Sequence, residues 1–227
     1  MITLANYFFF VLFFSHTRRR SNKAEITYQM LYGQDNYGPV RPDVLFGGGG
    51  RYFNGSDLTN SKINGLGGRN LWTEAENLGY EIVLDRNSMK AQSYNNKPLI
   101  GIWHYGNEDV WIDRHIYPQN IVASNYPIKY SSKDASIYQR VPNDQPDLSE
   151  QVEAALRVLH NRGGDNGFFL MVEGASIDKQ EHPMDFDRAM GELIDMDNAV
   201  GVAKAFAQQN GDTLILVTAD HAQVSIS

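Results

Sequence analysis

The sequence predicts an α/β fold, a three-layer sandwich with a largely parallel central sheet and helices on both faces. Uninterrupted apolar runs at 168–172 and 213–218 are typical of buried parallel strands, and a stretch with helical periodicity separates them at 186–208. A right-handed crossover through that helix would lay the two strands in parallel within one sheet, as neighbours or near neighbours.

The amino-terminal half alternates short apolar runs with one helical pattern, and turn-forming glycines follow the first run. Strands are predicted at 43–46, 81–84 and 98–103, and a helix is predicted at 70–78.

A long polar segment rich in proline, at about 105–146, indicates an irregular excursion from the core. Helical order returns at Asp147, where the spacing to Glu150 matches a capping box, and the following helix ends near Gly163. The next helix, at 186–208, has Asp185 as its predicted N-cap. Its predicted core-facing stripe consists of Phe186, Met190, Leu193, Ile194, Val200 and Phe206.

Residues 1–23 differ from the rest, because they combine a short apolar run with four basic residues and no acid. The run is too short for the ~20 residues that cross a bilayer, and it makes a poor signal peptide. We therefore predict a leader or foreign segment at 1–23 and a single domain at 24–227.

Composition supports a globular domain, with 42% hydrophobic and 11% aromatic residues among 227. The net charge of −7 argues against a nucleic-acid surface, and the sequence argues against a membrane span. The absence of cysteine excludes disulfides and thiolate metal sites, so any metal must bind nitrogen and oxygen ligands.

Acidic residues and histidines follow both apolar runs, where the carboxyl ends of parallel strands open onto one edge of a sheet. A single aspartate or histidine there is more often a cap or turn residue than a ligand. Several together favour a site for Zn²⁺ or Mg²⁺, because burying them unpaired would destabilise the fold. The candidate metal ligands are Glu173, Asp178, His182, Asp220 and His221.

Three segments resemble the alkaline phosphatase family: GFFLMVEGASID at 167–178, with a histidine four residues on, TLILVTADH at 213–221, and PDVLFGGG at 42–49. The resemblance covers roughly residues 24–223 and implies hydrolysis of phosphate monoesters with two zinc ions and one magnesium ion.

Each matched position takes a role from the family. The resemblance implies that Glu173 binds magnesium, that Asp178 and His182 bind one zinc, and that Asp220 and His221 bind the other. It also implies a homodimer and a periplasmic or extracellular location.

The family's serine nucleophile follows an aspartate upstream of the matched region, and this chain contains no Asp-Ser dipeptide. We therefore assign no catalytic nucleophile and expect the chain to be inactive on its own. The resemblance implies that residues 24–227 are a partial domain, truncated at both ends, and that the chain is an internal fragment of the enzyme. Two alternatives stay open: a non-catalytic metal-binding fragment or pseudoenzyme, and a metallophosphoesterase or sulfatase relative whose nucleophile comes from elsewhere.

Overall fold

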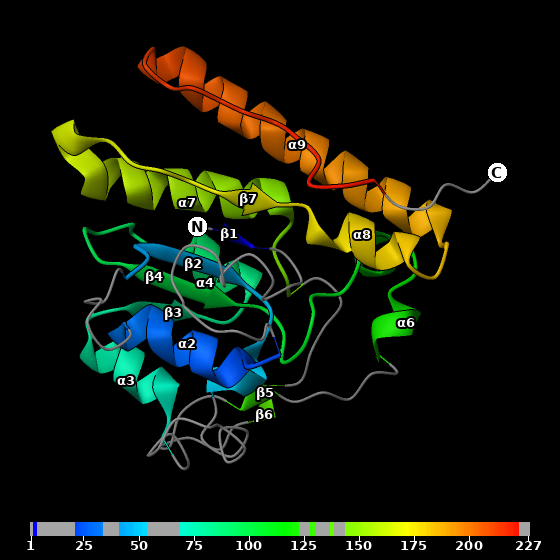
Figure 1. Cartoon of the computed structure of the whole chain (residues 1–227), viewed down its shortest axis with the longest axis horizontal. Coiled ribbons are helices and arrows are strands. Elements are labelled where there is room, and N and C mark those ends of the chain that lie inside the picture. The colour runs from blue at the N-terminus through cyan, green and yellow to red at the C-terminus, as the bar shows by residue number, and fades with distance from the viewer. Residues whose placement is uncertain are drawn as a thin grey trace.

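The computed structural model describes residues 2–3, 21–33, 41–53, 69–122, 128–129, 137–138 and 144–222. Within them a five-stranded parallel sheet has the order β3-β4-β2-β1-β7 (Figure 1). Its strands are β1 (Ile2–Thr3), β2 (Val44–Gly47), β3 (Glu81–Val83), β4 (Leu99–Ile102) and β7 (Val172–Glu173). A separate antiparallel pair consists of β5 (Ile128–Lys129) and β6 (Ile137–Tyr138). The α-helices are α2 (Lys23–Tyr32), α3 (Leu71–Asn77), α4 (Arg86–Lys90), α5 (Trp111–His115), α6 (Gln119–Val122), α7 (Leu148–Gly163), α8 (Ala175–Glu181) and α9 (Phe186–Asn210), and 3₁₀ turns lie at Gly50–Phe53 and Gly164–Asn166.

Helices cover both faces of the sheet, with α7 and α9 on one side and α2 and α3 on the other (Figure 1). Alternate residues of β2 supply both cores: Val44 and Phe46 pack in the cluster that contains the apolar face of α7, and Leu45 packs with α2 and α3. This alternation follows from the two-residue period of a strand. The predicted α/β class, with a parallel sheet between helical layers, is confirmed.

Gly101 in β4 shows how tightly one face is packed. A Cβ atom at this position would lie 2.3 Å from the Trp103 ring and 2.7 Å from the Phe46 ring. Only glycine leaves room for the two aromatic rings, whose centroids are 5.5 Å apart over the sheet.

The caps predicted from sequence form as expected. The Asp147 backbone N–H donates to the Glu150 carboxylate at 3.0 Å, which is half of a capping box at the start of α7. The Asp185 carboxylate accepts from the Arg188 backbone N–H at 3.2 Å at the start of α9.

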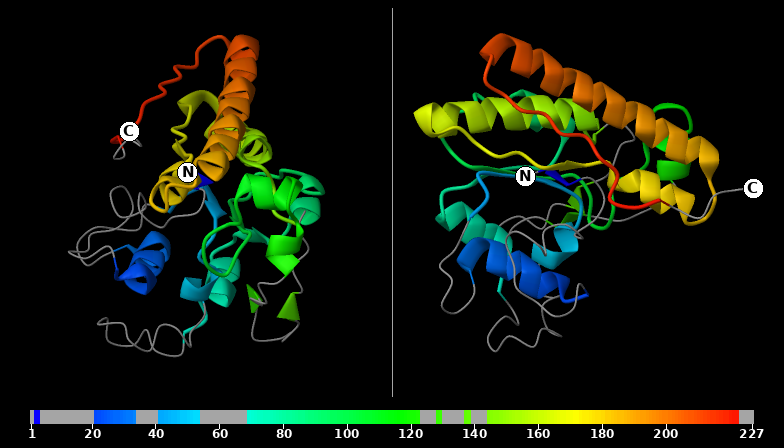
Figure 2. Two further views of the ribbon diagram at one scale, coloured as in Figure 1. Left: turned by 90° about the vertical axis from the view of Figure 1, so that its right-hand side faces the viewer. Right: turned by 45° about the horizontal axis from the view of Figure 1, so that its top comes forward.

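The prediction for the two carboxyl-terminal strands is wrong in part. Only Val172 and Glu173 of the first apolar run pair in the sheet, and residues 213–218 form no strand. The chain turns at Gly211, whose φ of 78° gives a left-handed cap, and then runs back along α9 toward α8 (Figure 2). An apolar run forms a strand only where a neighbour offers backbone partners, and the two-residue edge strand β7 offers few.

The predicted inner face of α9 is also wrong in part, since of its residues Phe206 packs against the core that contains α7. Phe186, Met190, Leu193 and Ile194 are exposed. The buried face instead consists of small and acidic residues, namely Ala189, Gly191, Glu192, Asp195 and Ala199. Hydrogen-bond donors on α5 and at the start of α7 make this possible, because they satisfy the buried carboxylates.

The predicted excursion at 105–146 contains α5 and α6, and most of its second half lies outside the described residues. The apolar run of the predicted leader also lies outside them, while Ile2–Thr3 pairs as β1 between β2 and β7. The division at residue 23 stays a prediction. Among the described helices, none is long and apolar enough to cross a membrane.

Candidate functional site

Glu173 ends β7, the edge strand of the sheet, and its side chain is only partly exposed to solvent. Its Oε2 atom is buried and has no hydrogen-bond partner in the structure. Burial, followed by the negative charges of Asp220 and Asp178, raises the pKa of Glu173 to about 8. Because a desolvated carboxylate surrounded by negative charge favours the binding of a cation, Glu173 fits the role of a metal ligand.

Asp178 and His182 lie on the helix that follows, one turn apart. His182 caps the end of α8, and its backbone N–H donates to the Asp178 carbonyl at 3.1 Å. The His182 Nε2 atom lies 3.4 Å from Asp178 Oδ2. The helix therefore presents a carboxylate and an imidazole together, as the i, i+4 spacing requires.

Asp220 and His221 reach the same place although no strand carries them there. His221 Nε2 lies 3.7 Å from Asp178 Oδ1 and 3.4 Å from Asp220 Oδ2. The two oxygens of Asp178 thus face two different histidines, one from α8 and one from the carboxyl-terminal segment.

The structure brings all five sequence-predicted residues to the carboxyl end of β7, since Asp178 and Asp220 both act on Glu173 electrostatically. In the part of the chain that the structure describes, no three or more of these side chains are arranged to hold a metal ion. The donor types fit Zn²⁺ and Mg²⁺, and the unpaired Glu173 oxygen is the observation that favours a cation. Their role as ligands stays a prediction.

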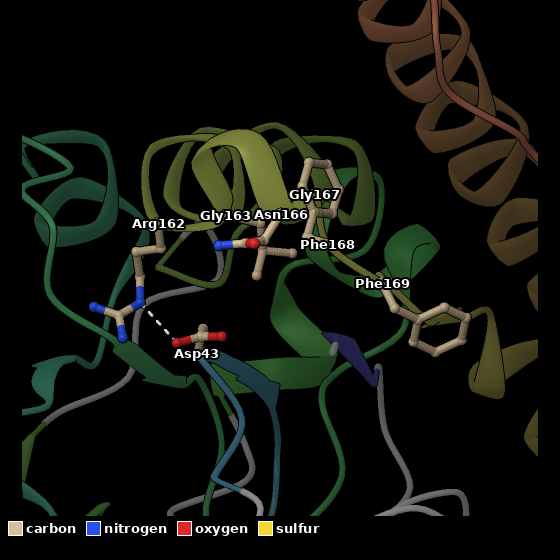
Figure 3. Close-up of a pocket in the computed structure, with 8 residues that line it drawn as sticks. Asp43, Arg162, Gly163, Asn166, Gly167, Phe168 and Phe169 are labelled. Carbon is tan, nitrogen blue, oxygen red and sulfur yellow. Dashed lines mark hydrogen bonds and ion pairs between the residues drawn. The ribbon is translucent and has the colours of Figure 1, made fainter.

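A pocket of about 270 Å³ lies at the amino ends of the strands, near the start of β2 (Figure 3). Asp43, which precedes β2, pairs there with Arg162 at 2.7 Å from carboxylate to Nε, and Phe168 lines the wall. Asp43 marks the amino end of β2, which runs in the same direction as β7, so the pocket and Glu173 lie at opposite ends of the strands. The pocket contains none of the predicted metal ligands.

Sequence reasoning missed a buried cluster of charged side chains between α5, α7 and α9. Arg114, only 3% exposed, donates to Asp147 at 2.6 Å and to Asp195 at 3.4 Å. The Glu192 carboxylate accepts the Trp111 backbone N–H. Burial raises the pKa of Glu192 to about 7, and it raises the pKa of Asp195 as well. The sequence does carry a signal for this cluster. Glu192 and Asp195 fall on the same face of α9 as its small residues, and this face differs from the predicted apolar stripe.

Comparison with known proteins identifies the alkaline phosphatase family. A family model described as "Alkaline phosphatase" matches residues 13–227. Alkaline phosphatase H of Pseudomonas aeruginosa is 38% identical over 82% of the chain, and alkaline phosphatase of Escherichia coli K12 is 34% identical over 91%. The chain covers 37% and 40% of these two proteins, so it spans about two fifths of their length.

Solved structures show the same fold. Alkaline phosphatase of Thermus thermophilus matches with a TM-score of 0.61 at 24% identity, over 86% of this chain and 32% of that one. The enzyme of the Antarctic bacterium TAB5 matches with a TM-score of 0.60 at 19% identity, over 93% of this chain and 49% of that one. A TAB5 variant, with a TM-score of 0.57 at 18% identity over 93% of this chain and 48% of that one, holds Mg in its M3 site. Since the family model spans nearly the whole sequence and these curated relatives exceed 30% identity, the chain belongs to the alkaline phosphatase family.

Proposed function

We propose that this chain carries metal-binding residues of an alkaline phosphatase that hydrolyses phosphate monoesters. The observation that carries the proposal is the gathering of Asp178, His182, Asp220 and His221 beside the unpaired, buried oxygen of Glu173. Family membership supports the reaction class, and magnesium in the TAB5 variant supports the use of metal ions.

By this proposal Glu173 would hold Mg²⁺, and the two pairs of aspartate and histidine would each contribute to a Zn²⁺ site. Asp178 is central, because each of its carboxylate oxygens lies near one histidine: Oδ2 is 3.4 Å from His182 Nε2, and Oδ1 is 3.7 Å from His221 Nε2. Bound divalent ions would supply positive charge that polarises a phosphate group and stabilises charge on the reacting oxygens.

We further propose that the 227-residue chain alone hydrolyses monoesters slowly, with or without added zinc and magnesium. Each proposed zinc site has two ligands here, whereas zinc is held firmly by three or four. When catalytic residues act together, losing some of them removes most of the rate of hydrolysis. The family also suggests a homodimer in the periplasm or outside the cell.

A direct test measures zinc binding by competition with a chromophoric chelator and hydrolysis of p-nitrophenyl phosphate by the same preparation. We expect Asp178→Asn to weaken zinc binding by about tenfold or more. The matched control Asp165→Asn removes the same charge from an exposed turn and should leave binding unchanged. Equal zinc affinity in the wild type and Asp178→Asn would contradict the metal assignment.

Metal retention separates the enzyme from its alternative. A non-catalytic metal site is favoured by the open setting of the two histidines, whose side chains are more than half exposed. Stoichiometric retention of one metal ion with a gain in stability would support that alternative. Trapping a phosphorylated serine or threonine on this chain would instead show a nucleophile of its own and refute our proposal of slow turnover.

A further inference from the structure

The connection that carries His182 is held by an arginine of α9. Residues 182–185 join α8 to α9, and Arg188 lies in the first turn of α9. The Arg188 guanidinium donates to Asp185 from Nη1 at 2.5 Å, and it donates to both oxygens of Asp113 on α5, from Nε at 3.0 Å and from Nη2 at 2.9 Å. Such a paired contact fixes orientation as well as distance.

Burial of apolar side chains does not hold this connection. Met184 and Phe186 are both 62% exposed. Met184 also has a φ of 59°, a left-handed conformation that destabilises a side-chain-bearing residue by about 1 kcal/mol or more. Polar contacts must therefore stabilise the connection in this shape.

Asp113, the partner of Arg188 on α5, is itself held in place by further contacts. Asp113 accepts a further hydrogen bond from Asn120 Nδ2 at 2.7 Å. Its neighbour Arg114 is buried and bonded to Asp147 at the start of α7. The pair of Arg188 and Asp113 thus ties the connection to a helix that is itself fixed to the core.

We propose that Arg188 is a positioning residue that, through Asp113 and Asp185, holds His182 where it can share a metal ion with Asp178. This inference rests on the proposed function, because it concerns the same ligands. Arg188 contacts neither the metal ligands nor a substrate in the proposal; it restricts the connection that follows His182, as outer residues restrict ligands in metal sites.

Charge alone predicts the opposite effect to positioning. Removing a positive side chain near a cation site reduces repulsion, so Arg188→Gln should strengthen zinc binding if only Coulomb forces act. If Arg188 positions His182, the same substitution weakens zinc binding despite the lost repulsion. The sign of the change therefore separates the two explanations.

The test measures zinc affinity by chelator competition in the full chain, under conditions where circular dichroism shows each variant folded. We expect Arg188→Gln and Asp113→Asn each to raise the zinc Kd by about tenfold, and the double variant to raise it no further, because both remove one interaction. Arg188→Lys keeps the charge without the paired geometry and should fall between. The control Arg157→Gln breaks an exposed pair with Glu153 on α7 and should leave Kd unchanged.

Unchanged or tighter zinc binding in Arg188→Gln overturns the inference. Hydrogen exchange gives a second measurement that needs no metal: amides of residues 182–187 should exchange faster in Arg188→Gln than in Arg157→Gln. If the wild type binds no zinc at Asp178, the proposed function fails, and equal exchange in the two variants would then refute the positioning role separately.

Discussion

The buried carboxylate of Glu192 gives the sharpest prediction of how stability depends on pH. Burial raises its pKa from the ordinary 4.5 to about 7, and the side chain is only 5% exposed. A carboxyl group whose pKa is raised in the folded state makes its full contribution to the free energy of unfolding below its pKa in the unfolded state. That contribution is lost as the pH rises through its pKa in the folded state. The shift corresponds to about 3 kcal/mol, of which about 2 kcal/mol should disappear between about pH 5.5 and pH 8.

Glu192→Gln isolates this effect, because the amide oxygen can still accept the Trp111 N–H while the charge is removed. We expect the variant to be similar to the wild type below about pH 5 and more stable by about 3 kcal/mol at pH 8. Urea unfolding followed by tryptophan fluorescence measures the difference. Glu153→Gln, an exposed site on α7, is the control and should show no such pH dependence. A difference that is constant with pH, or largest at low pH, would refute the assignment.

Three further predictions concern stability and are read from urea unfolding midpoints. Gly101→Ala should destabilise by about 1–3 kcal/mol, because its Cβ would collide with the Trp103 ring; a neutral result would mean that the ring can move. Tyr80→Phe should destabilise by about 1–3 kcal/mol, since the buried hydroxyl donates to the Pro42 carbonyl at 2.7 Å and its loss leaves that oxygen unpaired. Met184→Gly should stabilise by about 0.5–1 kcal/mol by relieving its positive φ, and a loss of stability would show that the side chain matters despite its exposure.

Local rules predicted the parts of the fold that depend on neighbours in sequence. The apolar run that forms β2, the helical pattern that forms α3 and the capping box at Asp147 all follow from side-chain type and spacing. The segment at 213–218 could not be predicted in the same way, because strand formation depends on a partner that local sequence does not specify.

The candidate site shows the same division. Asp178 and His182 meet because helical spacing brings them together, and this is visible in the sequence. His221 approaches Asp178 by a path that the sequence did not indicate, since its segment lies outside the sheet. The pairing of Arg188 with Asp113 joins residues that are 75 positions apart in the sequence, so no rule of local spacing could predict it.

The exposed segment after α9 has a consequence for the behaviour of the chain in solution. Leu214 and Leu216 are both 81% exposed, and Val217 is 60% exposed, in an extended run without proline or charge. Windows of this composition stack between identical chains into cross-β assemblies when they are accessible. The net charge of −7 opposes such contacts at low ionic strength, and salt screens that repulsion. Colloidal stability of the isolated polypeptide would therefore fall as salt rises, with residues 213–218 as the segment through which molecules associate.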